Sequence, residues 1–348
     1  MRTTRHALHP QCAAIRPWSR RSSGRRLLRL LISQRLSAMP LWYGTAMAAE
    51  LELITVRDWL RYAASRFGAA GLVYGHGTSN APDEAAYLIL HTLSLPIDRL
   101  DPWLDARLLP EERARLQTVI EARIATRQPA SYLTKEAWIG GHSFYVDERV
   151  IVPRSHIGEL LCNAISAAGD EWPLGIDDPA AVGTILELCT GSGCLAILAA
   201  LAFPEARIDA SDISEDALAV ARRNVGDYGL EERIGLSRSD LFAAHAGNRY
   251  DLVIANPPYV SGQAVAAFPP EYAAEPKIAH SGGADGLDLV RRILAEAGDY
   301  LTPEGSLIVE VGTGRAILED EYPGMPFLWL DTAESEGEVF MLPASALH

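Results

Sequence analysis

An amide and two prolines follow directly on a run of apolar residues in the stretch DLVIANPPYVSG, residues 251–262. The Asn256 side chain offers a carbonyl acceptor and an NH2 donor, and the Pro257 carbonyl adds a second acceptor. Neither proline has an N–H group that would compete for these acceptors, and Pro258 extends the same turn. Two neighbouring acceptors suit a planar NH2 group, and the Tyr259 ring can lie against such a group. The stretch therefore indicates a binding turn for an exocyclic base amine or a side-chain amide, unless it only ends a strand.

A glycine turn occurs earlier, in the stretch ILELCTGSGCLAILAAL, residues 185–201. Gly191 and Gly193 stand where a strand would turn sharply into a helix whose first N–H groups can face an anion. Asp212 follows Gly191 by 21 residues, a position from which a carboxylate can accept hydrogen bonds from two ribose hydroxyls. This spacing fits NAD as well as S-adenosylmethionine, and a glycine turn that only packs a helix on a sheet is the alternative. We assign the cofactor site to Glu187, as partner of a ligand ammonium group, and to Thr190, Gly191, Gly193, Asp212, Asp240 and Asn256.

A side-chain amide held at the Asn256 turn is a poor nucleophile, because its nitrogen lone pair is delocalised into the carbonyl. Hydrogen bonds accepted from its N–H groups return electron density to the nitrogen. Alignment of that nitrogen with a sulfonium methyl group can contribute ~7–11 kcal/mol through proximity and orientation. The positive sulfur already activates the methyl group, so no strong base is needed before transfer. On this hypothesis Asn256, Pro257 and Tyr259 act in catalysis, and substrate binding uses Asn256, Pro257, Pro258 and Tyr259.

Alternating strand and helix patterns from residue 184 onward would position both turns. We expect strands at TILELC, ARIDAS, IGLSRS, DLVIA and SLIVEV, and helices from Gly193, over 215–226 and over 286–300. This alternation is typical of an α/β fold with a doubly wound parallel sheet. The strand order of such a sheet reverses between its first and fourth strands, so Asn256 should lie beside the Gly191 loop. The stretches PFLWLD and EVFMLP should add a final antiparallel pair.

Helical patterns fill the preceding part of the chain. Apolar residues recur at helical spacing over 55–67, 82–93 and 110–125, which indicates a small helical bundle. The stretch AWIGGHSFYVDERVIVPRS follows, with two glycines between short β-like runs, and indicates a hairpin linker. A further helix is expected over 157–169.

Charge is unevenly spread along the 348 residues. Residues 1–50 hold nine Arg and one acid, Glu50, whereas the remaining chain has 22 Lys and Arg against 44 Asp and Glu. A net charge of −22 in that remainder disfavours stable binding to nucleic acid and suits a basic protein partner. The Arg- and Ser-rich first segment fits an over-extended start, with Met39 or Met47 as the first residue. A basic disordered arm, or organelle targeting by residues 1–46, is the alternative.

The remaining residues disfavour several kinds of site and location. The nine His show no metal-ligand spacing, so no metal site is expected. The four Cys give no disulfide framework, which favours a reducing compartment and a cytoplasmic location. No apolar run approaches the roughly 20 residues of a membrane span, so no membrane partner is expected.

With these motifs the chain resembles the class I S-adenosylmethionine-dependent methyltransferases. More narrowly, it resembles the protein-glutamine methyltransferases that alkylate the side-chain amide nitrogen. The resemblance covers about residues 51–348 and implies a Rossmann-like, seven-stranded domain, a glutamine bound at the Asn-Pro-Pro-Tyr turn, and S-adenosylmethionine as cofactor. We expect a basic extension at 1–50, a helical substrate-recognition domain at 51–132, a β-hairpin linker at 133–154 and a methyltransferase domain at 155–348.

Two branches of that family modify either release factors or the third protein of the large ribosomal subunit. The chain resembles the ribosomal-protein branch at four places: Cys189 in LELCTGSGC, Arg154-Ser155, and the stretches PPEYAAEPKIAHSGGADGLDLVRRIL and YPGMPFLWL. His156 departs from the proline expected in that branch. The resemblance implies that the substrate is a basic protein of the large ribosomal subunit. Arg154 either shapes the cofactor or substrate pocket or forms a surface ion pair.

Other functions stay open. The nearest is the same chemistry on a peptide-chain release factor. An adenine-N6 methyltransferase on RNA or DNA would use the turn for an exocyclic amine, but the acidic body argues against it. A non-catalytic nucleotide-binding scaffold or an NAD enzyme would have no evident use for Asn256.

Overall fold

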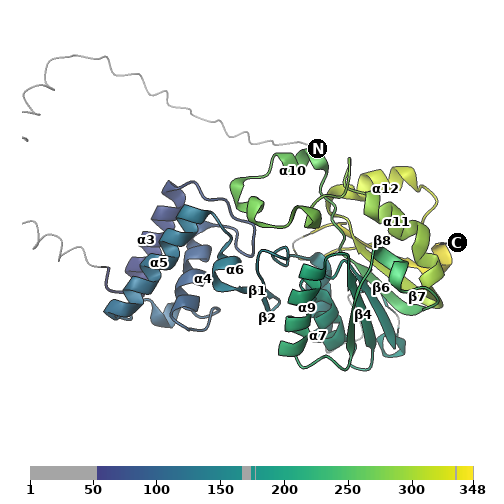
Figure 1. Ribbon diagram of the computed structural model, residues 1–348, viewed down its shortest axis with the longest axis horizontal. Helices are drawn as coiled ribbons and strands as arrows, with labels where there is room; N and C mark the ends of the chain where they lie inside the picture. Colours follow the sequence, from purple (N-terminus) through teal and green to yellow (C-terminus); the bar gives the residue numbers. More distant parts are fainter. Residues whose placement is uncertain (1–52, 167–173, 177, 334, 348) are drawn as a thin grey trace, which may run out of the picture. The chain divides into compact units, whose positions relative to one another are not determined.

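The structure of the protein is a computed structural model that describes residues 53–166, 174–176, 178–333 and 335–347. The basic segment predicted at 1–50 and the last residues of the helix predicted at 157–169 lie outside the described residues. The chain divides after Leu53, and all the elements below belong to the unit Ile54–His348 (Figure 1). None of the described helices is both long and apolar enough to cross a membrane.

Three helices lie where the apolar spacing predicts them: α3 Val56–Ala69, α4 Ala81–Thr92 and α5 Pro110–Thr126. The side chains of Thr55 and Asn80 cap the first two, each accepting a hydrogen bond from a backbone N–H of the first turn. The sequence does not predict α6 Ala130–Thr134, because five residues are too few to show a helical period.

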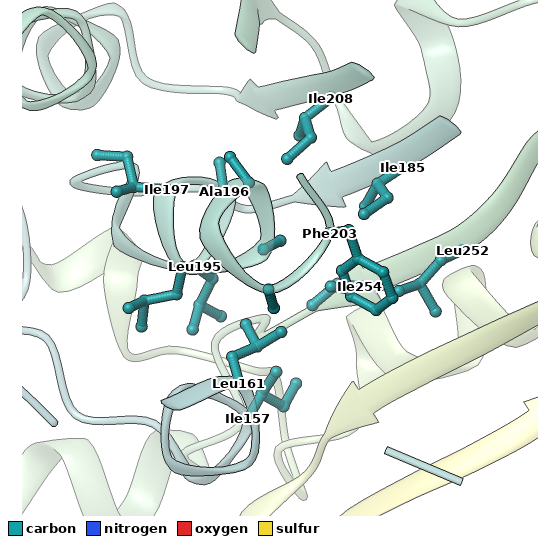
Figure 2. Close-up of a cluster of buried hydrophobic side chains, with 14 of the residues drawn as sticks. Ile157, Leu161, Ile185, Leu195, Ala196, Ile197, Phe203, Ile208, Leu252 and Ile254 are labelled. Carbon is teal, nitrogen blue, oxygen red and sulfur yellow. The ribbon is translucent and has the colours of Figure 1, made fainter. Parts of the chain in front are cut away.

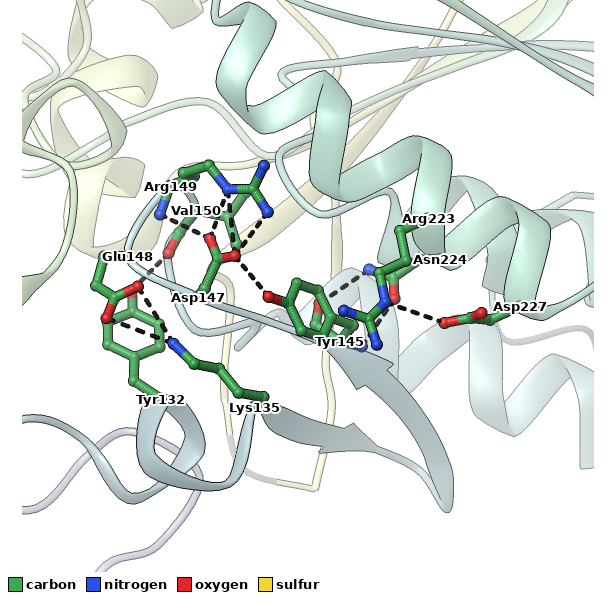
Figure 3. Close-up of polar contacts among 10 residues, drawn as sticks. All are labelled: Tyr132, Lys135, Tyr145, Asp147, Glu148, Arg149, Val150, Arg223, Asn224 and Asp227. Carbon is green, nitrogen blue, oxygen red and sulfur yellow. Dashed lines mark hydrogen bonds and ion pairs between the residues drawn. The ribbon is translucent and has the colours of Figure 1, made fainter.

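The predicted hairpin is confirmed. Strands β1 Glu136–Ile139 and β2 His142–Tyr145 pair antiparallel around Gly140 and Gly141, which both have positive φ, at +52° and +86°. Such a turn favours glycine because both central residues occupy the left-handed region. Asn224 attaches the hairpin to helix α9 Glu215–Asp227: its amide accepts from the Tyr145 N–H at 2.7 Å and donates to the Tyr145 carbonyl at 3.0 Å (Figure 3).

Seven strands form the main sheet, in the order β5-β4-β3-β6-β7-β9-β8. The first five run parallel, and β9 is antiparallel to both β7 and β8. The predicted doubly wound sheet and the predicted final antiparallel pair are therefore confirmed, with the reversal of order at β3 and β6. The strands are β3 Thr184–Leu188, β4 Arg207–Asp212, β5 Ile234–Arg238, β6 Tyr250–Ala255, β7 Leu301–Glu310, β8 Leu328–Leu330 and β9 Val339–Pro343.

Helices cover both faces of this sheet (Figure 1). Leu252 and Ile254 of β6 point to the face covered by α7 His156–Ser166 and α8 Cys194–Ala202, as Figure 2 shows. Val253 and Ala255 point to the opposite face, covered by α11 Asp288–Glu296 and α12 Arg315–Glu321. Because consecutive residues of β6 are buried on opposite faces, the strand reads as a continuous apolar run.

A long connection joins β6 to α11. It contains α10 Gly262–Ala266 and two short 3-10 helices, η4 Pro270–Ala274 and η5 Lys277–Ala279. The connection folds back on itself, since the Val260 N–H donates to the His280 carbonyl and the Gly282 N–H donates to the Val260 carbonyl, both at 3.0 Å. Further 3-10 turns are η1 Asp101–Trp103, η2 Pro179–Ala181, η3 Leu241–Ala244, η6 Ala297–Tyr300, η7 Gly312–Gly314 and η8 Ala344–Ala346.

Candidate active site

Two adjoining cavities lie at the carboxyl ends of β3, β4 and β6, and Asn256 lines both. The first has a volume of about 500 Å³ and the second about 300 Å³. Ligands of doubly wound sheets bind at this edge, next to the point where the strand order reverses. The wall common to both cavities is formed by Ile151, Cys189, Gly191, Asn256, Pro258 and Ala279. The structure thus brings Asn256 beside the Gly191 loop, as the sequence predicts.

Asp212 and Asp240 line the first cavity. The two oxygens of Asp212 accept hydrogen bonds from the Gly191 N–H at 2.9 Å and the Ser214 N–H at 2.8 Å. Burial raises the pKa of Asp212, and the two N–H groups fix its carboxylate against the cavity. Each carboxylate oxygen has a second lone pair that stays available to hydroxyl donors. Asp240 differs, because its half-exposed carboxylate pairs with Arg292 at 3.0 Å.

The glycine loop is shaped by three positive φ angles. Gly191 has φ +54°, Gly193 has φ +80° and Cys189 has φ +60°. Gly191 lines both cavities, but Gly193 lines neither. A Cβ atom at Gly193 would lie 3.1 Å from the Ala221 Cβ, so this glycine allows the loop to pack on α9. At Cys189 an L-residue occupies a conformation that costs it roughly 1–2 kcal/mol and costs glycine little.

Glu187 and Thr190 line the second cavity and not the first. Glu187 is buried on β3, and its carboxylate accepts a hydrogen bond from the Thr190 hydroxyl at 2.5 Å. Burial raises the pKa of Glu187 to about 8, although the hydrogen bond from Thr190 favours the ionised form. A carboxyl group this poorly solvated gains most from a cationic partner.

The Asn-Pro-Pro-Tyr turn forms one side of the second cavity. Within the described residues, no hydrogen bond to protein occupies the side-chain amide of Asn256, so its donor and acceptor are available to a ligand. The Tyr259 hydroxyl is occupied, because it donates to the Glu310 carboxylate at 3.0 Å, and burial raises the Tyr259 pKa. Pro257 is buried and lines only this cavity, whereas Pro258 lines both.

Glycines pack closely around that turn. A Cβ atom at Gly282 would lie 2.5 Å from the Pro258 carbonyl oxygen, and one at Gly286 would collide with the Tyr259 carbonyl. A Cβ atom at Gly312 would lie 2.8 Å from two ring carbons of Tyr259. Real Cβ contacts are not this short, so the path of the turn depends on the absence of three side chains.

Arg154 is an ion-pair residue that also lines the second cavity. Its guanidinium binds both oxygens of Glu275, at 3.1 and 2.9 Å, and lies 5.4 Å from the ring centroid of Tyr272. Arg154 therefore lines the pocket and forms an ion pair, but this pair is not on the surface, because its partner Glu275 is buried. His280 and His76 approach the same carboxylate, with Nε2 at 3.0 and 3.5 Å.

Sequence reasoning missed several residues at this site. Glu310 is a single acid at the carboxyl end of the apolar stretch SLIVEV, and that position is the signal by which it could have been found. Tyr272 and Phe268 line the second cavity from a connection without any periodic pattern. Ile278 and Leu241 add apolar surface to the first cavity.

Comparisons with known proteins identify the family. A family model described as Methyltransferase small domain matches residues 176–268. A protein of Burkholderia pseudomallei named ribosomal protein uL3 glutamine methyltransferase is 54% identical over 300 residues, which is 84% of this chain and 95% of that protein. Proteins of the same name from Bradyrhizobium diazoefficiens and Neisseria meningitidis are 53% and 54% identical over 85% and 86% of this chain, and 92% and 96% of their own length. The resemblance to the ribosomal-protein branch is confirmed, and the chain belongs to the ribosomal protein uL3 glutamine methyltransferase family.

Proposed function

We propose that this chain transfers a methyl group from S-adenosylmethionine to the side-chain amide nitrogen of a glutamine in ribosomal protein uL3. The observation that carries the proposal is the place of Asn256 in the wall between two cavities. One side of that wall suits a nucleoside and the other suits a flat amide. Membership of the family supports uL3 as the substrate.

The residues of the first cavity fit the cofactor. Its volume of about 500 Å³ lies within the usual range of small-molecule sites. Asp212 presents acceptors for ribose hydroxyls, and Ile213, Leu241 and Ile278 offer apolar surface to a base. When bound, the cofactor supplies a methyl group activated by a sulfonium. Glu187, across the Gly191 loop, presents a carboxylate to an ammonium group.

The residues of the second cavity fit a glutamine side chain. Asn256 accepts from one amide N–H group through its side-chain oxygen, and the Pro257 carbonyl accepts from the other. These two bonds orient the nitrogen and return electron density to it, while the Tyr259 ring borders the flat group. Because the Tyr259 hydroxyl donates to Glu310, it is not the group that removes the amide proton. That proton leaves to water after transfer.

The negative charge of the chain supports a basic protein as its substrate. Outside residues 1–50 the chain carries a net charge of −22, and ribosomal proteins are strongly cationic. Complementary charge accelerates the encounter of two proteins and favours the correct orientation.

The test is transfer of a labelled methyl group to purified uL3, a release factor and ribosomal RNA, with wild-type protein and two variants. Asn256→Ala should lower the rate on uL3 by at least about 100-fold, the loss seen when one oriented donor or acceptor is removed from an active site. Binding of S-adenosylmethionine, measured by calorimetry, should stay nearly unchanged. Asn163→Ala, on the exposed face of α7, is the matched control. Full activity of Asn256→Ala, or transfer to RNA or the release factor in preference to uL3, would refute the proposal.

A further inference from the structure

Glu310 receives hydrogen bonds from two separate parts of the chain, the turn at Tyr259 and residues 155–157. It is the last residue of β7, and only 1% of its surface is exposed. Its partners are the Tyr259 hydroxyl at 3.0 Å, the Ser155 hydroxyl at 2.6 Å, and the backbone N–H groups of His156 at 2.9 Å and Ile157 at 3.4 Å. All four groups donate, so the carboxylate serves only as an acceptor for them.

Two of these donors belong to different segments that line the second cavity. Tyr259 belongs to the turn after β6, and Ser155 belongs to the segment before α7; both line the cavity, whereas Glu310 does not. One oxygen of Glu310 holds Tyr259, and the other holds Ser155 and the first N–H groups of α7. A single carboxylate that does not itself line the cavity therefore holds two cavity-lining segments together.

The ring of Tyr259 also lies close to the residues that follow β7. Gly312 follows β7, and a Cβ atom there would lie 2.8 Å from two carbons of the ring. The hydroxyl is held by Glu310, and the ring edge occupies space that a side chain at residue 312 would need. The end of β7 thus determines where the ring lies, although no residue of β7 lines the cavity.

We propose that Glu310 is a positioning residue, which holds Tyr259 and Ser155 at the separation that orients the glutamine amide for methyl transfer. This inference rests on the proposed function. A role confined to capping α7 is the competing explanation, because carboxylates also stabilise helix N-termini.

The test is a double-mutant cycle of Glu310→Gln and Tyr259→Phe, with kcat and KM for uL3 and the Kd for S-adenosylmethionine. Each single variant should lower kcat by about tenfold, because each loses the hydrogen bond between the Tyr259 hydroxyl and a carboxylate. Glu310→Gln also places an NH2 group opposite groups that themselves donate. Changes in KM and in the cofactor Kd should stay within about twofold. In the Tyr259→Phe background, Glu310→Gln should cost less than about threefold, because the shared interaction is already absent.

The outcomes separate the two explanations. If Glu310 only caps α7, Glu310→Gln will cost the same factor with Tyr259 or Phe at residue 259, and the inference is overturned. If Glu310→Gln does not fold, Tyr259→Phe decides alone, and unchanged kcat rejects the inference. Tyr228→Phe is the matched control, because its hydroxyl donates to the Ser143 carbonyl at 3.0 Å and it lines neither active-site cavity. Failure of the wild-type protein to methylate uL3 would instead reject the proposed function.

Discussion

At the scale of single residues, the site combines side chains that the protein holds in place with one side chain that is left for a ligand. Asp212, Tyr259 and Arg154 are each held by hydrogen bonds of the protein. The side-chain amide of Asn256 has no such partner among the described residues. On the proposed function Asn256 recognises another amide and needs this freedom, whereas the groups around it must not move.

Glu187 gives the site a pH-dependent element. Its pKa in the folded protein is about 8, against an ordinary value of 4.5. Between these values the folded state binds more protons than the unfolded state, so stability falls as pH rises and levels off above about 8. Glu187→Gln should remove this contribution. The melting temperature of the variant, relative to wild type, should therefore be higher at pH 9 than at pH 5 in thermal unfolding without cofactor. A difference that does not change with pH would contradict this assignment.

Gly312 provides a second test at residue scale. Gly312→Ala places a Cβ atom against the Tyr259 ring, at a φ of +52°. Transfer to uL3 should fall at least about tenfold, because a displacement near 1 Å is enough to lose that much rate. Gly229→Ala is the control, since Gly229 has φ +65° but nothing within 4 Å of the added Cβ atom. It carries the backbone strain alone, and equal losses of activity in both variants would exclude a specific contact with Tyr259.

At the scale of elements, the connection between β6 and α11 is fixed at its middle by buried carboxylates. Glu275 accepts from the Val152 N–H at 2.9 Å and from both nitrogens of the Arg154 fork. Glu271 accepts from the Val73 N–H at 3.0 Å and pairs with Arg127 at 3.1 Å. Residues of the helical part of the chain and of the linker thus hold the connection, and this connection lines both cavities.

Substitution of Glu275 should therefore destabilise the folded protein. Glu275→Leu leaves the Arg154 charge without its buried partner and should lower the free energy of unfolding by about 3–5 kcal/mol, measured by urea denaturation. Glu148→Leu is the control, because Glu148 forms an exposed ion pair with Lys135. Exposed pairs contribute about 0–1 kcal/mol. If Glu275→Leu lowers the free energy of unfolding no more than Glu148→Leu does, the Glu275 carboxylate does not hold the connection.

Acid should weaken the same contact. Burial raises the pKa of Glu275, but hydrogen bonds from His280 and His76 and the charge of Arg154 outweigh it and hold the pKa well below its usual range. The stabilisation is present above the ordinary Glu pKa and is lost as pH falls toward the depressed value.

Sequence patterns predict the sheet better than this connection, for a physical reason. Strands such as β6 are buried on both faces and read as unbroken apolar runs between turn residues. The path of residues 256–287 depends on individual polar contacts and on glycines that leave room for the backbone. Neither feature leaves a periodic signal in the sequence. The turn residues Asn256 to Tyr259 could be found because their chemistry is local. The place of Glu310 at the end of a strand could be found in the same way, but its contact with Ser155 and that of Glu275 with Arg154 could not, because these partners lie more than 100 residues away in the chain.

At the scale of the whole molecule, charge should govern the encounter with substrate. A net charge of −22 outside residues 1–50 predicts that association with basic uL3 weakens as salt screens it, with a Debye length of about 10 Å at 0.1 M. The KM for intact uL3 should rise several-fold, roughly, between 50 and 300 mM NaCl, while kcat changes little. A short uncharged peptide containing the acceptor glutamine is the control and should show no such rise. Equal salt dependence for both substrates would contradict steering by charge.

The three glycines that surround the turn also bear on how such enzymes are recognised in genomes. A search for the letters Asn-Pro-Pro-Tyr retrieves any chain with that string, whatever path its backbone takes. A search that also requires glycine at the positions equivalent to 282, 286 and 312 selects for the space that the folded turn occupies. Homologues that keep the four letters but have lost one of these glycines are the ones in which a different acceptor should be sought first.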